Sequence, residues 1–96
     1  MILLRRVAGG SMLPALRPGQ VVVAIRATRR LVRPSQVGQI VIIRHDGLDK
    51  IKRVSQVRDD RIFVVGDNPE HSTDSRHFGW LPAASIRGRV VWPRPL

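Results

Sequence analysis

Residues 39–57 have the sequence QIVIIRHDGLDKIKRVSQV, in which two strand-like runs flank a short turn. The run from Gln39 to Arg44 is rich in β-branched residues, which favour strands. The Asp46-Gly47 pair is typical of a tight β-hairpin. We therefore expect Leu48 to Val57 to return along the first run as its antiparallel partner, and this hairpin indicates a mainly β fold.

Similar short apolar runs continue on both sides of this hairpin, with turn-forming pairs such as Pro18-Gly19 between them. The chain has 96 residues, 43% of them apolar, which is enough to enclose one small core. We expect a single domain over residues 1–96, mainly β, forming a small coiled β-sheet or barrel with one or two short helical turns. The expected strands are Ile2–Val7, Val21–Ile25, Gln39–Arg44, Leu48–Val57, Arg61–Gly66 and Arg87–Trp92, and the expected helical turns are Leu13–Leu16 and Leu81–Ile86.

The chain is strongly basic, with 17 Lys and Arg against 7 Asp and Glu and a net charge of +10. Such a balance favours anionic partners: nucleic acid, anionic lipid headgroups or an acidic protein. Residues 26–36 carry several arginines and are expected to form an exposed loop, and residues 67–77 are expected to form a second polar loop. The absence of cysteine excludes disulfides, thiolate chemistry and cysteine-based zinc sites.

No apolar run in the sequence approaches the ~20 residues that a membrane-spanning helix needs. Residues 1–4 are apolar but are followed at once by Arg5 and Arg6, a pattern unlike the apolar segment of a signal peptide. We therefore expect a soluble, cytoplasmic chain whose basic surface can make peripheral contact with an anionic membrane.

Ser11 lies directly after two glycines and shortly before Pro14. Glycine permits close backbone approach, and proline fixes the turn that follows. A serine held in this way is exposed, with its own backbone N–H free to face a reacting carbonyl oxygen, which suits a nucleophile. The alternative, on these residues alone, is an ordinary Gly-Gly-Ser turn between two strands.

A serine nucleophile needs a general base, and the first candidates are histidines. His45, His71 and His77 lie in predicted turns or loops, without the spacing of a Ser-His-Asp triad that uses Asp67 or Asp74. The loop of residues 67–77 also lacks the ligand spacing of a metal site, so no metal is expected.

The other candidate bases are Lys50 and Lys52, the two lysines of the chain. They are two residues apart on a predicted strand, so their side chains share a face. Burial among Ile and Val residues lowers the pKa of a lysine toward neutral pH and makes it a base. The alternative is that both are exposed strand residues, and this is the expectation for Lys50, which lies next to Asp49 and the turn.

Four groups of residues occur in a fixed order along most of residues 9–90. They are Gly10-Ser11-Met12-x-Pro14-x-Leu16-x-x-Gly19, Gly38-x-Ile40-Val41, Ile51-Lys52-Arg53-Val54, and Gly66-Asp67-Asn68 followed by Ser72-x-Asp74-Ser75-Arg76-x-Phe78-Gly79. In this order and spacing they resemble the conserved boxes of the type I signal peptidases, a family of Ser/Lys proteases. Any one group is weak, but the four together are highly specific and outweigh both the plain turn and the histidine triad.

The resemblance implies that Ser11 is the nucleophile and that Lys52, neutral at rest, is its general base. It also implies that Ser72 orients the lysine, while the Ser11 backbone N–H binds the oxyanion together with either the N–H of Gly10 or a water. The remaining implied site residues are two bracing ion pairs and a pocket residue, namely Asp74 with Arg76, Asp67 with Arg53, and Met12. The substrate would be a protein precursor bound as an extended peptide, and the reaction would need no cofactor and no metal.

The chain departs from the family pattern at several points. Gly9 stands where many bacterial members have a serine that helps bind the oxyanion, and Gln20 and Gln39 replace residues that are usually Asp. The sequence also shows no membrane anchor and no large extra domain. From this we expect the short, soluble branch of the family, which the run Ser72–Arg76 resembles. The function this implies is removal of an N-terminal leader, with the precursor of nickel superoxide dismutase as substrate and the nickel belonging to that substrate.

Two other functions compete with this expectation. The self-cleaving domain of LexA-like repressors shares the fold and the Ser/Lys pair, but this sequence lacks a helix-turn-helix and an Ala-Gly cleavage segment before Ser11. A non-enzymatic basic β-barrel that binds nucleic acid or anionic lipid fits the charge. However, single-strand binders add aromatic platforms, and the sequence has two Trp and two Phe, so no nucleic acid partner is expected. An inactive, degenerate protease conflicts with the presence of both Ser11 and Lys52.

Overall fold

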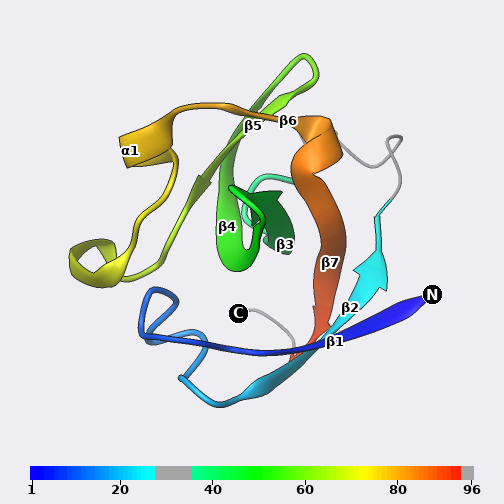
Figure 1. The fold of residues 1–96 in the computed structure, drawn as a ribbon, viewed down its shortest axis with the longest axis vertical. Helices are drawn as coiled ribbons and strands as arrows, with labels where there is room; N and C mark the ends of the chain where they lie inside the picture. Colours follow the sequence, from blue (N-terminus) through cyan, green and yellow to red (C-terminus); the bar gives the residue numbers. More distant parts are fainter. Residues whose placement is uncertain (28–35, 94–96) are drawn as a thin grey trace.

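The computed structural model describes residues 1–27 and 36–93, and within them seven strands form one antiparallel sheet (Figure 1). The strand order is β1-β2-β7-β3-β4-β5-β6, and the two end strands are not paired with each other. Among the described residues the sheet is therefore an open, coiled one, which is one of the two forms that the sequence predicted, and not a closed barrel. The predicted basic loop of residues 26–36 lies mostly outside the described residues. The strands are β1 (Ile2–Arg6), β2 (Val21–Arg26), β3 (Ile40–His45), β4 (Leu48–Arg58), β5 (Arg61–Val65), β6 (Leu81–Pro82) and β7 (Ile86–Trp92).

β3 and β4 form the predicted hairpin, with His45 opposite Leu48 beside the turn and Ile40 opposite Arg53 at the far end. Asp46 and Gly47 have φ angles of 52° and 74°. A two-residue hairpin turn of this kind needs positive φ at both central positions, which explains the Asp-Gly pair.

The two edges of β4 are paired differently along its length. One edge pairs with β3 from Leu48 to Arg53. The other edge pairs with β5 only from Arg53 to Arg58, so among the described residues the segment 48–52 has no strand partner on that side. β1, at the end of the sheet, likewise pairs on one edge only within the part of the chain that the structure describes.

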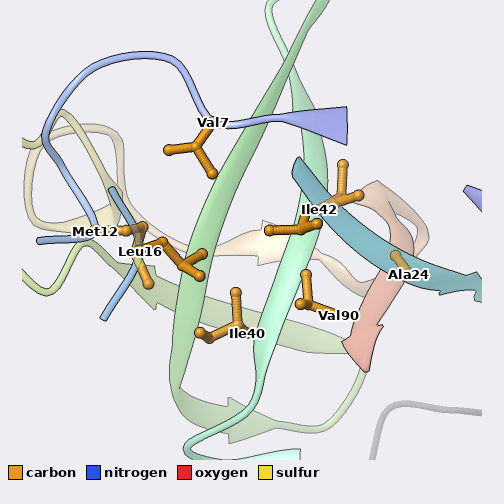
Figure 2. Packing of buried hydrophobic residues seen from close by; sticks show 8 residues of the cluster. Val7, Met12, Leu16, Ala24, Ile40, Ile42 and Val90 are labelled. Carbon is orange, nitrogen blue, oxygen red and sulfur yellow. The ribbon is translucent and has the colours of Figure 1, made fainter. Parts of the chain in front are cut away.

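β3 is buried on both faces because a hydrophobic cluster lies on each side of it. In the first cluster, Met12 and Leu16 from the segment after β1 pack beside Ile40 (Figure 2). Met12 and Leu16 are each 1% exposed, so they fix the turn that contains Ser11 to the core. Alternate residues of β3 belong to the two clusters, Ile40 and Ile42 to the first and Val41 and Ile43 to the second.

Two short helices lie where the sequence predicted a polar loop over residues 67–77. They are the 3-10 helix η3 (Pro69–His71) and the helix α1 (Ser75–Phe78). Asp74 caps α1 by accepting a hydrogen bond from the Arg76 backbone N–H, and the His77 side chain accepts one from the Asp74 backbone N–H. The usual capping box has Glu or Gln in place of this histidine, so the signal was hidden in the sequence.

The other predicted helical turns have different outcomes. Residues 81–86 contain the 3-10 helix η4 (Ala83–Ser85), as expected. Leu13–Leu16 is instead part of a hydrogen-bonded turn, in which the Leu16 N–H donates to the Met12 carbonyl at 2.9 Å. No helix within residues 1–27 and 36–93 is long and apolar enough to cross a membrane.

Candidate active site

The turn that presents Ser11 follows β1 and is held by the segment that follows β5. The Asn68 backbone N–H donates to the Ser11 carbonyl at 2.8 Å, and the Asn68 side-chain amide donates to the Gly10 carbonyl at 3.1 Å. Sequence reasoning placed Asn68 inside a motif but gave it no role. The contact joins residues far apart in the chain, and nothing in the local pattern indicates it.

Gly66 allows three segments of the site to come together. A Cβ atom built at this position would lie 2.6 Å from Ser72 Cβ and 2.7 Å from the Ser11 carbonyl oxygen. Both distances are shorter than any real Cβ contact, so a side chain here would push the segments apart. Gly66 is therefore required for the close approach of the Ser11 turn and the Ser72 segment.

Lys52 lies on β4, where it is buried with 5% of its surface exposed. Its ammonium donates to Ser72 Oγ at 3.2 Å, and the Ser72 hydroxyl donates to Asp74 Oδ2 at 2.6 Å. The structure thus brings together Lys52 and Ser72, the base and the orienting serine that the resemblance implied.

The environment of Lys52 favours its neutral form. Burial lowers the pKa of Lys52 from its ordinary value, and the positive charges of Lys50 and Arg76 lower it further. The Asp74 carboxylate opposes this shift, but Ser72 lies between it and the lysine as the direct hydrogen-bond partner. A lysine with a lowered pKa is available as a general base nearer to neutral pH.

Asp74 is the fully buried charge of the site, with 0% of its surface exposed. Burial alone would raise its pKa, but hydrogen bonds from Arg76, Ser72 and the Gly66 backbone N–H outweigh this and hold the pKa well below its usual range. The Arg76 guanidinium donates through Nε at 2.9 Å, and the Gly66 N–H donates at 2.8 Å. The carboxylate therefore ties β5, the Ser72 segment and α1 into one unit.

The second predicted pair, Arg53 with Asp67, is bidentate. Arg53 Nε and Nη2 each lie 2.8 Å from an oxygen of Asp67, and Arg53 Nη1 donates to the Gly38 carbonyl at 2.6 Å. The hydrogen bond to Asp67 raises the pKa of the Arg53 guanidinium. This pair links β4 to the end of β5 on the face opposite Lys52.

Ser11 and Lys52 line the same surface groove, although they come from distant parts of the sequence. The end of β1 and the start of β4 form its two sides. The lining residues are Arg6, Val7, Ala8, Ser11, Met12, Asp49, Lys50, Ile51 and Lys52. Met12, the predicted pocket residue, lies at this groove while its side chain is buried in the first hydrophobic cluster.

The histidines do not line this groove. His45 stacks on Phe78 with ring centres 4.0 Å apart, and His77 takes part in the cap of α1. His71 ends the helix η3. Within the part of the chain that the structure describes, no group of three His, Asp or Glu residues could hold a metal ion.

Lys50 differs from the exposed strand residue that the sequence predicted. It is half-buried, with its Nζ 3.1 Å from His45 Nδ1 and 5.1 Å from the centre of the Phe78 ring. The sequence gave no sign of these contacts because Phe78 belongs to α1, which was itself not predicted.

The chain is similar to known proteins of one family. Residues 47–94, half of the chain, match the family described as signal peptidase, peptidase S26. The mitochondrial ATP-independent inner membrane protease subunit 1b of Arabidopsis thaliana is 36% identical over 110 aligned residues, which cover 88% of this chain and 64% of the relative.

Two shorter matches are to animal proteins. The mitochondrial inner membrane protease subunit 1 of Xenopus tropicalis is 46% identical over 46 residues, 45% of this chain and 28% of the relative. The protein of the same name from Mus musculus is 42% identical over 48 residues, 47% of this chain and 29% of the relative. The chain thus spans less than two thirds of the length of each of these relatives.

Proposed function

The chain belongs to the signal peptidase family, peptidase S26, and from this premise we propose that it is a serine endopeptidase with a Ser11/Lys52 dyad. One observation carries the proposal: the half-buried Ser11 and the buried Lys52, whose pKa is lowered, line one groove. A nucleophile and a neutral base at the same surface are the two groups that acyl transfer requires.

The proposed reaction has two halves. Neutral Lys52 takes the proton of Ser11 Oγ as this oxygen attacks the carbonyl carbon of the scissile bond, and the Lys52 ammonium then gives the proton to the leaving amine. Water, deprotonated by Lys52, attacks the acyl-enzyme and releases Ser11. The backbone N–H groups of Ser11 and Gly10 stabilise the oxyanion.

Ser72 and Asp74 act on the reaction through Lys52. The Ser72 hydroxyl lies between the ammonium and the Asp74 carboxylate, so it fixes the direction of the lysine side chain. This arrangement supports an orienting role for Ser72 and a bracing role for Asp74, and neither residue needs to contact the substrate.

We propose that the substrate binds as an extended strand in the groove. The edge of β4 over residues 48–52 that has no strand partner among residues 1–27 and 36–93 faces the groove from one side, and the end of β1 borders it from the other. Unpaired strand edges offer N–H and C=O groups to an incoming peptide, which gains main-chain hydrogen bonds by adding a strand.

The proposed substrate class is a protein precursor that loses an N-terminal leader. Its candidate member is the precursor of nickel superoxide dismutase, which the likeness of residues 72–76 to the short branch of the family supports. The proposed location is the cytoplasm, in peripheral contact with an anionic membrane.

Two features support the membrane contact. Ile2, Leu4 and Ile25 are exposed on the paired strands β1 and β2, and Trp92 is exposed beside them on β7. The net charge of +10 complements an anionic lipid surface.

The test is cleavage by the purified chain of two probes, the nickel superoxide dismutase precursor and a peptide library from a digested proteome. Products are read by mass spectrometry from about pH 6 to 10, the range of a lowered lysine pKa. We expect cuts by the wild type and by the control Ser85→Ala, and none by Ser11→Ala or Lys52→Ala. Cutting of the library without the precursor would remove that substrate, and cutting that survives Ser11→Ala would overturn the dyad.

A further inference from the structure

Lys50 is a cation at the groove that lacks an anionic partner within the described residues. Its ammonium lies 3.1 Å from His45 Nδ1 and 5.1 Å from the centre of the Phe78 ring. A half-buried ammonium loses hydration without gaining a carboxylate in return, so an anion placed beside it gains more than in open water.

Three carboxylates lie around Lys50 and its partner His45. Asp46 lies 3.8 Å from His45 Nδ1 and its side chain is exposed to solvent, and the other two are engaged by arginines. Asp49 pairs with Arg5 at 3.2 Å and with Arg44 at 3.1 Å. Asp74 is bound by Arg76 on the far side of Ser72. Arg6, the arginine that lines the groove, donates to the Gly19 carbonyl. The groove therefore carries an excess of positive charge beside the nucleophile.

The spacing between Lys50 and Lys52 places the positive charge at a fixed distance from the proposed general base along β4. The two side chains lie on the same face of β4, opposite Ile43 and Val41. They are two positions apart, with Ile51 between them, or roughly 6.6 Å along a strand. A peptide that adds to the free edge of residues 48–52 repeats the same alternation. If one side chain of the bound peptide lies beside Lys52, the peptide side chain two positions along therefore points toward Lys50.

We propose that Lys50 forms a subsite for an acidic side chain, so that the substrates of this chain carry Asp or Glu at one fixed position near the cut. This inference rests on the proposed function and adds the chemical class of the substrate. His45 and Phe78 hold the ammonium in place, so that it meets the peptide in one position instead of following it as a free surface lysine would.

The experiment compares cleavage sites in the proteome-derived peptide library for the wild type, Lys50→Gln, Lys50→Glu and Lys50→Arg. Arg58→Gln is the matched control, because it removes a cation from the other end of β4, away from the groove. We expect the wild type, Lys50→Arg and Arg58→Gln to favour Asp or Glu at one position. Lys50→Gln should lose this preference, and Lys50→Glu should exchange it for Lys or Arg.

A matched pair of synthetic peptides with Glu or Gln at that position then gives the size of the effect. The wild type should prefer Glu in kcat/KM by about tenfold, as expected for one charge-assisted hydrogen bond, and Lys50→Gln should show no preference. Because both peptides are measured at one pH, the effect of Lys50 on the pKa of Lys52 cancels in the ratio.

Each failure has its own meaning. Cleavage by the wild type without an acidic preference, or with one that Lys50→Gln retains, overturns the subsite and leaves the dyad intact. Failure of the wild type to cut any library peptide overturns the proposed function, and the subsite with it.

Discussion

The two halves of β4 differ in what their edges face. Residues 53–58 are paired with β3 or β5 and with neighbouring loops, and they hold the fold together through Arg53 and Val54. Residues 48–52 have β3 on one edge and the groove on the other. One strand thus serves both as scaffold and as binding edge, and the change occurs where β5 begins to pair.

Lys52 and Arg53 show this change between adjacent residues. Arg53 has a bidentate carboxylate partner, and this hydrogen bonding favours its charged form. Lys52 is buried against a neutral hydroxyl, and this burial disfavours its charged form. Arg53 therefore stabilises the fold, whereas Lys52 carries a cost in stability that is useful for proton transfer.

The largest effect should come from the groove half. Ser11→Ala and Lys52→Ala should each lower kcat/KM by about 10⁴-fold or more, because a nucleophile and its base act as a unit. Cleavage of a library-derived peptide measures the loss, and circular dichroism checks that the fold is retained. Combining the two substitutions should cost little more than either alone, and simple multiplication of the losses would argue against a dyad.

The next effect concerns the buried brace. Asp74→Asn should lower the free energy of unfolding by about 3 kcal/mol, because it removes a buried carboxylate with several donors. Asp67→Asn, in the less completely buried pair with Arg53, should cost less. Urea unfolding at neutral pH measures both, and equal losses would contradict the difference in burial.

The stability lost in Asp74→Asn should depend on pH. The pKa of Asp74 is held low in the fold, so its contribution is fully present above about pH 4, the pKa of an unfolded Asp, and is lost as the pH falls further. The stability difference between wild type and Asp74→Asn should therefore shrink in acid. A difference that stays constant down to low pH would show that the charge of Asp74 is not the cause.

A smaller effect separates the two buried serines beside the brace. Ser72→Ala should lower kcat by roughly tenfold to a hundredfold, since a displaced base costs rate. Ser75→Ala loses only the hydrogen bond that its hydroxyl accepts from the Val64 N–H. It should reduce stability and leave kcat per folded molecule nearly unchanged. Similar kcat losses in both variants would assign Ser72 a structural role alone.

The smallest expected effect is a change in stability, and it distinguishes the two adjacent residues Lys52 and Arg53 of β4. Lys52→Met should raise the melting temperature by a few degrees at neutral pH, because it removes a desolvated amine. Arg53→Met should lower the free energy of unfolding by about 2 kcal/mol, since it breaks a charge-assisted pair. The gain from Lys52→Met should fade as the pH approaches about 10.4, where the unfolded lysine is also losing its proton. A loss of stability in Lys52→Met and a gain in Arg53→Met would contradict the roles assigned to these two residues.

The sequence predicted those parts of the molecule whose signals are local. The Asp46-Gly47 turn, the β-branched runs and the shared face of Lys50 and Lys52 follow from short-range rules, and the structure confirms them. The parts it did not predict depend on contacts across the chain. Asn68 reaches the Ser11 turn through the fold alone, and Phe78 reaches Lys50 from a helix whose cap uses an atypical histidine.

The most direct test of the account is the ionisation of Lys52. The chain has two lysines, so ¹⁵N-lysine labelling gives two side-chain signals, and Lys52→Met assigns them. NMR titration of the folded protein should show the Lys52 amine losing its proton well below the ordinary lysine pKa of about 10.4, at the same pH where kcat/KM rises. A Lys52 amine that stays protonated up to its ordinary pKa while the enzyme is already active would contradict its role as the base.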